Sequence, residues 1–466
     1  MEVTDPRRRL FLKAAGFFLL APRGLHARPP LEVAVVGAGL AGLQAALDLE
    51  AAGARVQLFE AGTRVGGRLM TIERGGLRFE VGGVEIGAGY RRVRGLAERF
   101  GLSLEPLPRQ ATDALLVLSD RQLLASAWPG TAALSGSPLE RVPPPQLLAR
   151  ALASEESLPR AADWLDPKHA ALDRPLAEHL IERGIPDCVL SWLEVGANYN
   201  SLRRVSTLDV LRRERLRRET DPEVLRLVGG NGLLPEAMAG ALREPVRFGH
   251  RLLEVRQEKG LVELIFARGE RVRAKRAVLA LPPSALAGLR FSPPLPAPLA
   301  EAIAWREMTA ITTVHFRPLE AFWEKDGLPP SMWVEGPLER VFAVAGEGPG
   351  GIERLIVWIN GEAARRADRL EEEAIGRWAE LELARLRPAS RGALRLLAVR
   401  SWARDPFFGG AYAEIRAGGC AAVAEAAATP HGLVHFAGEH TEFMHLGMEA
   451  ALASGERAAK EVLAAM

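Results

Sequence analysis

Three glycines at fixed spacing are the residues with the clearest chemical consequence. Gly37, Gly39 and Gly42 form the pattern GxGxxG. They directly follow the apolar run Val33–Val36, which is typical of a buried parallel strand. In such a turn the first glycine permits the bend, the second lets the backbone approach a pyrophosphate, and the third lets helix and strand pack closely. Glu60 follows a helix and a second strand, where a carboxylate accepts hydrogen bonds from ribose hydroxyls. The pattern predicts a dinucleotide site.

Two further glycine-rich segments carry residues suited to phosphates or to a polar ring system. Gly66-Gly67-Arg68 brings backbone amides and a guanidinium group towards a bound anion. Near the C-terminus, Glu439 lies in the segment FAGEHT, and Met448 lies at the start of the helical segment GMEAALASGER. A helix that begins at Met448 presents backbone N–H groups and a partial positive charge at its first turn.

These segments together resemble the flavin-dependent amine oxidase superfamily, which includes monoamine, polyamine and L-amino acid oxidases. The resemblance rests on GxGxxG, on the acid at 60, on GGR at 66–68 and on the C-terminal segments 401–412, 435–441 and 447–457. It implies FAD as the cofactor. It also implies hydride transfer from the carbon next to an amine nitrogen to the flavin, which gives an imine that hydrolyses to an aldehyde and ammonia, with hydrogen peroxide formed when oxygen accepts the electrons.

The resemblance also implies an α/β fold, with a doubly wound, Rossmann-like FAD-binding domain assembled from three chain segments and an inserted α+β substrate domain. Buried strands and proline-interrupted stretches alternate along the chain in a way that fits this interleaving. The expected parts are an export signal at 1–28, FAD-binding segments at 29–101, 222–290 and 400–466, and substrate-domain segments at 102–221 and 291–399. This organisation is compatible with a homodimer.

By resemblance, a set of residues spread over the three FAD-binding segments would hold the cofactor. The set comprises Gly37, Gly39, Gly42, Glu60, Gly67, Arg68, Leu252, Glu439 and Met448. Monoamine oxidases attach the flavin through a cysteine in the segment GGxY, and this chain has Ala411 at that position. An alanine cannot form a thioether, so we expect FAD to be bound non-covalently.

The reacting face departs from the superfamily at Thr313. Most members place a lysine beside the flavin, where it organises a water for reoxidation, and residues 310–316 of this chain contain no lysine. His315 lies two residues further on, hence on the same strand face as Thr313. Two interpretations of His315 stay open: a group that holds this water or acts as a base near its ordinary pKa of ~6.5, and a hydrogen-bonded core residue. The missing lysine argues against fast use of oxygen, and an alternative electron acceptor such as a quinone would need no such water.

Tyr412 matches one tyrosine of the aromatic cage that flanks the amine in monoamine oxidases. The second cage position aligns with Gly447, so the sequence predicts half of that cage. The alternative is that Tyr412 is a tyrosine packed under a loop.

Glu85 bears on the choice of substrate. L-amino acid oxidases carry an arginine at the aligned position, where it holds the substrate carboxylate, whereas an acid repels a carboxylate and attracts an ammonium group. Glu85 therefore favours a simple amine or polyamine over an amino acid. The alternative is that Glu85 pairs with Arg91, Arg92 or Arg94 and touches no substrate.

The sequence thus predicts an FAD-dependent oxidase of primary or secondary amines or polyamines, with Thr313, His315, Tyr412 and Glu85 on the reacting face. The partners would be a small amine and oxygen or another electron acceptor. Alternatives are an L-amino acid oxidase, a flavin amine dehydrogenase with a non-oxygen acceptor, a flavin desaturase, and a flavoprotein without turnover. No metal site is expected, because the two cysteines, Cys188 and Cys420, have no zinc-type spacing.

The N-terminus and the overall charge bear on location and partners. Arg8-Arg9-Leu10-Phe11-Leu12-Lys13 resembles a twin-arginine signal, and a short apolar segment and small residues follow it. We therefore expect export by the twin-arginine machinery to the periplasm or the extracellular space. The net charge of +2 over 466 residues is too small to indicate nucleic-acid binding.

Overall fold

The glycine-rich N-terminal stretch folds as a strand–helix–strand unit. The computed structural model describes residues 29–108, 113–119, 121–218 and 223–466. β1 (Leu31–Val36) leads through the glycine turn into α1 (Leu40–Ala51), and β2 (Val56–Phe59) returns parallel to β1, with Val33 opposite Val56. The sequence predicted this unit, and the predicted export signal lies outside the described residues.

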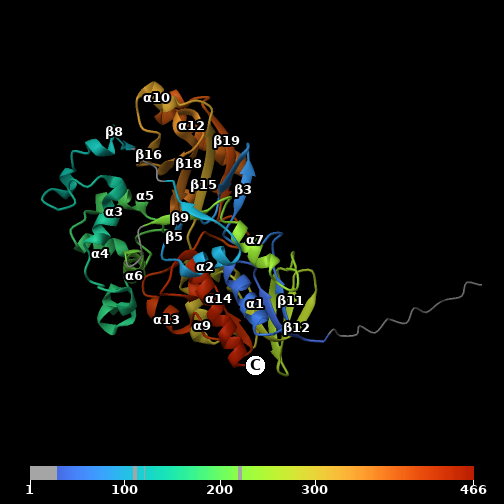
Figure 1. Ribbon diagram of the computed structural model, residues 1–466. Helices are drawn as coiled ribbons and strands as arrows, with labels where there is room; N and C mark the ends of the chain where they lie inside the picture. Colours follow the sequence, from blue (N-terminus) through green and yellow to red (C-terminus); the bar gives the residue numbers. More distant parts are fainter. Residues whose placement is uncertain (1–28, 109–112, 120, 219–222) are drawn as a thin grey trace, which may run out of the picture.

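This unit lies in a sheet that three distant chain regions build (Figure 1). The strand order is β13-β10-β11-β12-β1-β2, and β21 pairs in parallel with the C-terminal half of β12. The added strands are β10 (Leu252–Glu258), β11 (Leu261–Phe266), β12 (Arg271–Leu279), β13 (Arg290–Ser292) and β21 (Val434–Phe436). α1 packs against α14 (Gly447–Ala464), so the ends of the described chain share one hydrophobic core.

A second sheet lies above the first in Figure 1 and is built mainly from the later part of the chain. Its order is β19-β15-β18-β17-β16-β7-β8. The strands are β7 (Ala114–Val117), β8 (Gln122–Leu124), β15 (Ile311–Pro318), β16 (Ser331–Val334), β17 (Arg340–Ala345), β18 (Ile352–Asn360) and β19 (Leu394–Ser401). α12 (Glu372–Leu386) packs on one face of this sheet, so the other face is available to line a site.

Helices α3 to α6, at the left of Figure 1, form a third body with its own apolar core. They are α3 (Pro144–Ala153), α4 (Leu176–Glu182), α5 (Asp187–Gly196) and α6 (Thr207–Arg218). The other helices are α2 (Arg91–Arg99), α7 (Leu233–Gly240), α8 (Pro283–Leu286), α9 (Ala297–Ala304), α10 (Phe322–Asp326), α11 (Gly361–Ala367) and α13 (Cys420–Ala426).

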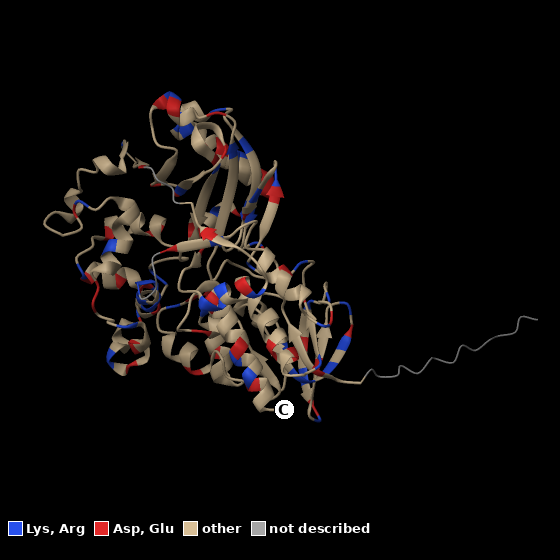
Figure 2. Ribbon diagram, in the orientation of Figure 1, with Lys and Arg blue, Asp and Glu red and all other residues tan. Residues whose placement is uncertain are grey.

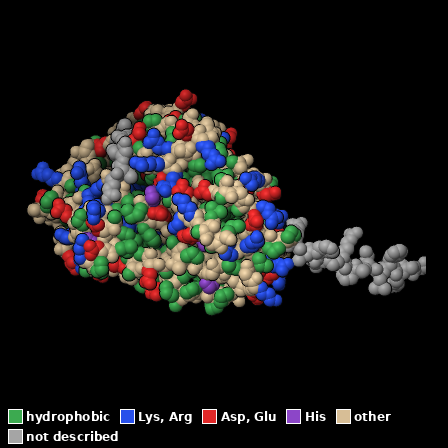
Figure 3. Space-filling view, turned by 60° about the horizontal axis from the view of Figure 1, so that its bottom comes forward, with side chains coloured by type: hydrophobic (Ala, Val, Ile, Leu, Met, Phe, Trp, Pro, Cys, Tyr) green, Lys and Arg blue, Asp and Glu red, His purple; other side chains and the backbone are tan. Residues whose placement is uncertain are grey.

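Short strands join these bodies. They form the pairs β3 (Thr71–Arg74) with β4 (Leu77–Glu80) and β14 (Arg306–Met308) with β20 (Ala413–Ile415), and the sheet β5 (Ile86–Gly87), β9 (Val224–Leu227) and β6 (Leu104–Pro106). On the face drawn in Figure 3, basic and acidic side chains are interspersed, in keeping with the small net charge. Within the described ranges, no helix has both the length and the apolar character needed to cross a membrane.

The α/β architecture agrees with the prediction, and two local features of the strands have simple causes. β10 begins only at Leu252, because the residues before it pass the end of β2, where Arg247 makes an isolated bridge to Phe59. The pair Phe322-Trp323 opens the short helix α10 and is buried. β15 has already ended, since Pro318 cannot donate to a strand ladder.

Candidate active site

A cavity of about 1160 Å³ lies where the three bodies meet. Its wall includes the glycine turn after β1, the loop at 66–69, strands β15, β17 and β18 of the second sheet, helix α6, and the start of α14. Typical small-molecule sites have volumes of ~300–1,000 Å³, so this cavity is large enough for an extended ligand and a second, smaller molecule.

The glycines of the turn have distinct steric roles. Gly37 has a φ of +105°, and a Cβ there would lie 2.5 Å from the carbonyl oxygen of Ala280. A Cβ on Gly42 would lie 1.9 Å from the carbonyl oxygen of Gly37, so this glycine lets α1 approach the turn. A Cβ on Gly39 would meet no atom within 4 Å, because this residue faces the cavity at the start of α1. Gly39 therefore leaves room for a ligand at a helix N-terminus, where phosphate groups bind.

The carboxylate of Glu60 is held at the tip of β2. It accepts hydrogen bonds from the backbone N–H groups of Ala38, at 2.8 Å, and Gly62, at 2.7 Å. Glu60 and Leu252 both line the same end of the cavity as the glycine turn. This arrangement fits the ribose-binding acid of a dinucleotide site.

Arg68 and Glu439 form an ion pair across the cavity wall. The Arg68 NH1 group lies 3.0 Å from the Oε1 atom of Glu439, and that oxygen also accepts the backbone N–H of Ala413 at 3.0 Å. Burial alone would raise the pKa of Glu439, but the guanidinium groups of Arg68 and Arg213 hold the pKa at about 2. Glu439 is therefore an anion at neutral pH. Its Oε2 atom has no hydrogen-bond partner among the described residues and can accept a ligand hydroxyl.

His440 supplies an orphaned polar group beside this pair. It is buried and lines the cavity, and neither ring nitrogen has a hydrogen-bond partner among the described residues. Burial lowers the pKa of His440 to about 3, so its imidazole is neutral. Buried polar groups are rarely left without a partner, which indicates that a polar ligand completes this wall. The open space at Gly39 and the unpartnered His440 both fit a bound FAD.

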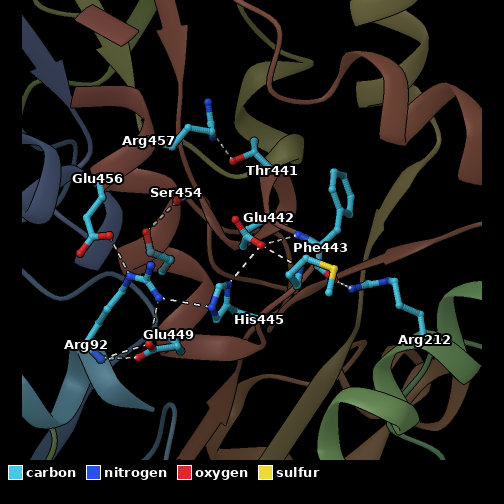
Figure 4. A network of polar contacts seen from close by, with 12 residues as sticks. Arg92, Arg212, Thr441, Glu442, Phe443, His445, Glu449, Ser454, Glu456 and Arg457 are labelled. Carbon is cyan, nitrogen blue, oxygen red and sulfur yellow. Dashed lines mark hydrogen bonds and ion pairs between the residues drawn. The ribbon is translucent and has the colours of Figure 1, made fainter. Parts of the chain in front are cut away.

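A polar network fixes the loop that leads into α14 (Figure 4). Glu449 accepts the backbone N–H of Arg92 with both carboxylate oxygens, each at 3.0 Å, and it also pairs with the Arg92 guanidinium at 3.1 Å. The carboxylate of Glu442 accepts the backbone N–H of Met444 at 2.7 Å and contacts His445 at 3.2 Å. These contacts hold Met448, in the first turn of α14, at the cavity wall.

Thr313 and His315 lie on one face of β15, but only Thr313 lines the cavity. His315 is buried behind it, stacked on Phe79, with its Nδ1 atom 3.0 Å from the NH1 group of Arg354. Because a guanidinium only donates, Nδ1 must accept, and the Nε2–H then donates to the Thr313 hydroxyl at 3.0 Å. Burial and the Arg354 charge hold the pKa of His315 well below its usual range. The imidazole is thus neutral, and the Thr313 hydroxyl hydrogen is free to point into the cavity.

Tyr412 lines the cavity and donates a hydrogen bond from its hydroxyl to the carbonyl oxygen of Asn198 at 2.7 Å. Gly447 also lines the cavity, and a Cβ there would lie 3.2 Å from the hydroxyl oxygen of Tyr90. Tyr90, which precedes α2, therefore fills the space beside Gly447 and provides a second aromatic wall from another part of the chain.

Glu85 is exposed and lines the cavity. Within the described part of the chain, no hydrogen bond or ion pair joins it to Arg91, Arg92 or Arg94. Arg92 instead pairs with Glu449 and Glu456, and Arg94 donates to the carbonyl oxygen of Ala88 at 2.9 Å. The Glu85 carboxylate thus remains available to the cavity.

The structure brings most of the predicted site residues to this one cavity. Those that line it are Gly37, Gly39, Glu60, Gly67, Arg68, Glu85, Leu252, Thr313, Tyr412, Glu439 and Met448, whereas Gly42 and His315 lie behind the wall. Sequence reasoning missed Tyr90, Arg354, His440 and the α6 residues Arg213 and Arg217, all of which line the cavity as well. The α6 sequence carries a dense run of arginines, and such a run is equally typical of a solvated helix face.

Comparison with known proteins places the chain in a family. Residues 40–463 match the family described as flavin containing amine oxidoreductase. L-amino-acid oxidase from Demansia vestigiata is 26% identical, over 96% of this chain and 89% of that protein. L-amino-acid oxidase from Naja atra is 24% identical, over 98% of this chain and 93% of that protein.

Solved structures share the fold. Cyclohexylamine oxidase from Brevibacterium oxydans IH-35A superposes with a TM-score of 0.76 and 23% identity, over 94% of this chain and 99% of that one. Putrescine oxidase bound to putrescine gives a TM-score of 0.74 and 21% identity, with the same coverage. The family match spans nearly the whole described chain and makes FAD the cofactor. It agrees with the dinucleotide site formed by the glycine turn and Glu60. The chain belongs to the family of flavin-containing amine oxidoreductases.

Proposed function

We propose that the protein oxidises a small amine at the carbon next to the nitrogen, giving an imine that hydrolyses to a carbonyl compound and ammonia. FAD, when bound, accepts the hydride and passes its electrons to oxygen or another acceptor. The observation that carries this proposal is a single cavity that joins Gly39 and Glu60, suited to the dinucleotide, to Thr313 and Tyr412. The L-amino-acid oxidase relatives support an amino group as the target.

The aromatic side chains that line the cavity away from the glycine turn can orient an amine and exclude water. Trp358 lies opposite Thr313 in the strand register, and Phe342 packs edge-on to it, so both rings form an apolar wall. Tyr412, fixed by its hydrogen bond to Asn198, offers a second aromatic surface. An amine held between such surfaces is positioned for reaction. Glu85 attracts an ammonium group as the substrate enters, which supports primary amines and polyamines.

A second candidate is a dehydrogenase whose acceptor is not oxygen. The described residues that line the cavity include no lysine. Thr313 occupies the position at which the resemblance to the superfamily predicts a lysine. This observation favours a quinone or a similar acceptor.

The test is anaerobic mixing of the purified yellow protein with separate panels of monoamines, polyamines and amino acids. We expect amines to bleach the flavin, and we expect air then to restore the colour with formation of peroxide. Slow recolouring in air but rapid recolouring with a quinone would identify the dehydrogenase. Absence of bleaching with every compound would contradict the proposed function.

We also propose that the protein is exported folded through the twin-arginine pathway, which suits a protein that must acquire FAD before export. The support is the sequence around Arg8 and Arg9, in the segment that precedes the described residues. The double variant Arg8→Lys/Arg9→Lys is expected to accumulate in the cytoplasm, whereas the unchanged protein reaches the periplasm or the medium. Equal distribution of the two proteins between cell fractions would rule out this route.

A further inference from the structure

The strand that follows Tyr412 carries a fully buried acid, Glu414. Tyr412 itself is held at two points: its carbonyl oxygen accepts the backbone N–H of Thr309 at 2.8 Å, and its hydroxyl donates to the carbonyl oxygen of Asn198 at 2.7 Å. Glu414 contacts both holding segments through its Oε2 atom, which accepts the Thr309 hydroxyl and the backbone N–H of Asn200, each at 3.0 Å. Glu414 therefore ties together the two segments that fix Tyr412 at the cavity wall.

The other carboxylate oxygen of Glu414 faces a second acid. Glu307 on β14 lies directly opposite Glu414 on β20, which places the two Cβ atoms on one face of the strand pair, ~4.5–5.5 Å apart. The Oε1 atom of Glu414 and the Oε2 atom of Glu307 are both buried, and neither has a hydrogen-bond partner among the described residues. The remaining oxygen of Glu307 pairs with Arg204 at 3.1 Å and with Arg365 at 3.3 Å. Arginines thus stabilise the charge of Glu307.

The surroundings of Glu414 do not stabilise a second charge in the same way. Within the described ranges no ion pair reaches its carboxylate. Arg213 acts on Glu414 from α6, the helix along which Figure 2 shows basic residues gathered, but Arg213 is paired with Asp209 at 2.9 Å. Tyr412 is neutral, because burial raises the pKa of its hydroxyl. Burial, supported by the charge of Glu307, raises the pKa of Glu414 to about 7.

We propose that Glu414 acts as a neutral carboxyl group that positions Tyr412, while Glu307 carries the negative charge of the pair. This inference rests on the proposed amine oxidation, in which Tyr412 offers an aromatic surface to the substrate. When Glu414 loses its proton, two buried carboxylates face each other, and their repulsion acts on the segments that Glu414 ties together. Substrate binding is therefore expected to weaken as the pH rises through about 7.

The experiment compares the unchanged protein with Glu414→Gln, because glutamine keeps the shape and the charge of the protonated acid. Its amide oxygen can accept the hydrogen bonds from Thr309 and Asn200, and its amide hydrogens can point to Glu307. Anaerobic flavin reduction by phenethylamine is measured from about pH 6 to pH 8, and the ratio of the two apparent Kd values at each pH removes the titration of the amine. We expect a ratio of about 1 at pH 6. At pH 8 the unchanged protein is expected to bind about 2- to 12-fold more weakly than Glu414→Gln, the change that loss of one neutral hydrogen bond produces.

Two further variants test the pairing of the acids. Glu307→Gln removes the facing charge, so the pH at which binding weakens is expected to move to a lower value. Glu362→Gln is the matched control, because Glu362 lies 3.9 Å from each of the arginines that hold Glu307, Arg204 and Arg365, but is exposed. It is expected to show the pH dependence of the unchanged protein. The same midpoint in Glu307→Gln and Glu362→Gln would contradict the pairing.

Thermal unfolding gives a second readout, which needs no substrate. Because burial raises the pKa of Glu414 above its ordinary value of 4.5, the folded protein holds this proton more tightly than the unfolded chain does. The resulting stabilisation is complete below about pH 4.5 and is lost as the pH rises through about 7. The unfolding temperature of the unchanged protein, relative to that of Glu414→Gln, is therefore expected to fall from about pH 5 to pH 8.

The two proposals fail in distinguishable ways. A ratio of Kd values that is the same at all pH values, or a constant difference in unfolding temperature, would overturn the role of Glu414. Absence of flavin reduction by amines would overturn amine oxidation instead. Calorimetric titration with 2-phenylethanol, which has the ring but no amine and no titrating group, then decides the role of Glu414. Weaker binding to the unchanged protein than to Glu414→Gln at pH 8 alone supports that role, and equal binding at both pH values overturns it.

Discussion

Gly39→Ala is expected to give a folded protein that is purified without its yellow colour. The Gly39 backbone has φ −76° and ψ 176°, a conformation that alanine adopts without strain, and the new Cβ would meet no protein atom within 4 Å. The methyl group would instead occupy space beside the N-terminus of α1, where a pyrophosphate approaches the backbone. Loss of one or two charge-assisted hydrogen bonds, worth ~1.5–3 kcal/mol each, weakens FAD binding by between about 10-fold and about 10⁴-fold.

The measurements are the ratio of flavin to protein absorbance after purification, FAD titration of the apoprotein, and thermal unfolding without FAD. Gly95→Ala is the matched control, because this glycine lies on the exposed side of α2, away from the cavity, and its Cβ also meets nothing within 4 Å. It is expected to bind FAD normally. A yellow Gly39→Ala protein with unchanged FAD affinity would show that the phosphates lie elsewhere.

The cofactor end of the molecule was predictable because its determinants are local. Close contacts within the turn, and with the strand beside it, require glycine at Gly37 and Gly42. Because these contacts are local, they appear in the sequence as glycines at a fixed spacing. Glu60 follows at the end of the next strand, where the strand–helix–strand unit fixes its position. Glu439 and Met448 were predicted from the resemblance rather than from local determinants, and both line the cavity.

The substrate end was less predictable, because its residues meet only through tertiary structure. Tyr90 fills the space beside Gly447 although the two residues lie far apart in the chain, so the cage position that lacks an aromatic residue in the sequence has a tyrosine beside it in space. Arg213 and Arg217 line the cavity, but helical periodicity cannot distinguish a cavity wall from a face in bulk solvent. His315 shares a strand face with Thr313, but the alternation of side chains along a strand does not say whether a residue reaches the cavity or lies buried behind it. The protonation state of His315 depends on Arg354, which comes from another strand.

Thr313→Lys is expected to speed reoxidation of the reduced flavin by air by at least about tenfold, since a positioned proton-transfer group contributes ~10²–10⁴-fold. Thr313 lines the cavity, so a lysine there extends into it, and burial together with the nearby Arg354 charge would lower the pKa of its amine. A neutral amine can hold a water by accepting its hydrogen bond. The measurement is anaerobic reduction by dithionite, mixing with air-saturated buffer, and recording of the recovered flavin absorbance.

Thr313→Val separates the contribution of the hydroxyl from that of the side-chain volume. The Thr313 hydroxyl accepts a hydrogen bond from the His315 Nε2–H. If this hydroxyl already positions a water, flavin reoxidation by air is slower in Thr313→Val, whereas flavin reoxidation by a quinone proceeds at an unchanged rate. Because the pKa of His315 is held well below its usual range, this difference should persist from about pH 6 to pH 8, without a step near ~6.5. An unchanged air rate in Thr313→Lys would mean that Thr313 is not aligned with the lysine of the superfamily, and the preference for a non-oxygen acceptor would then lose its physical basis.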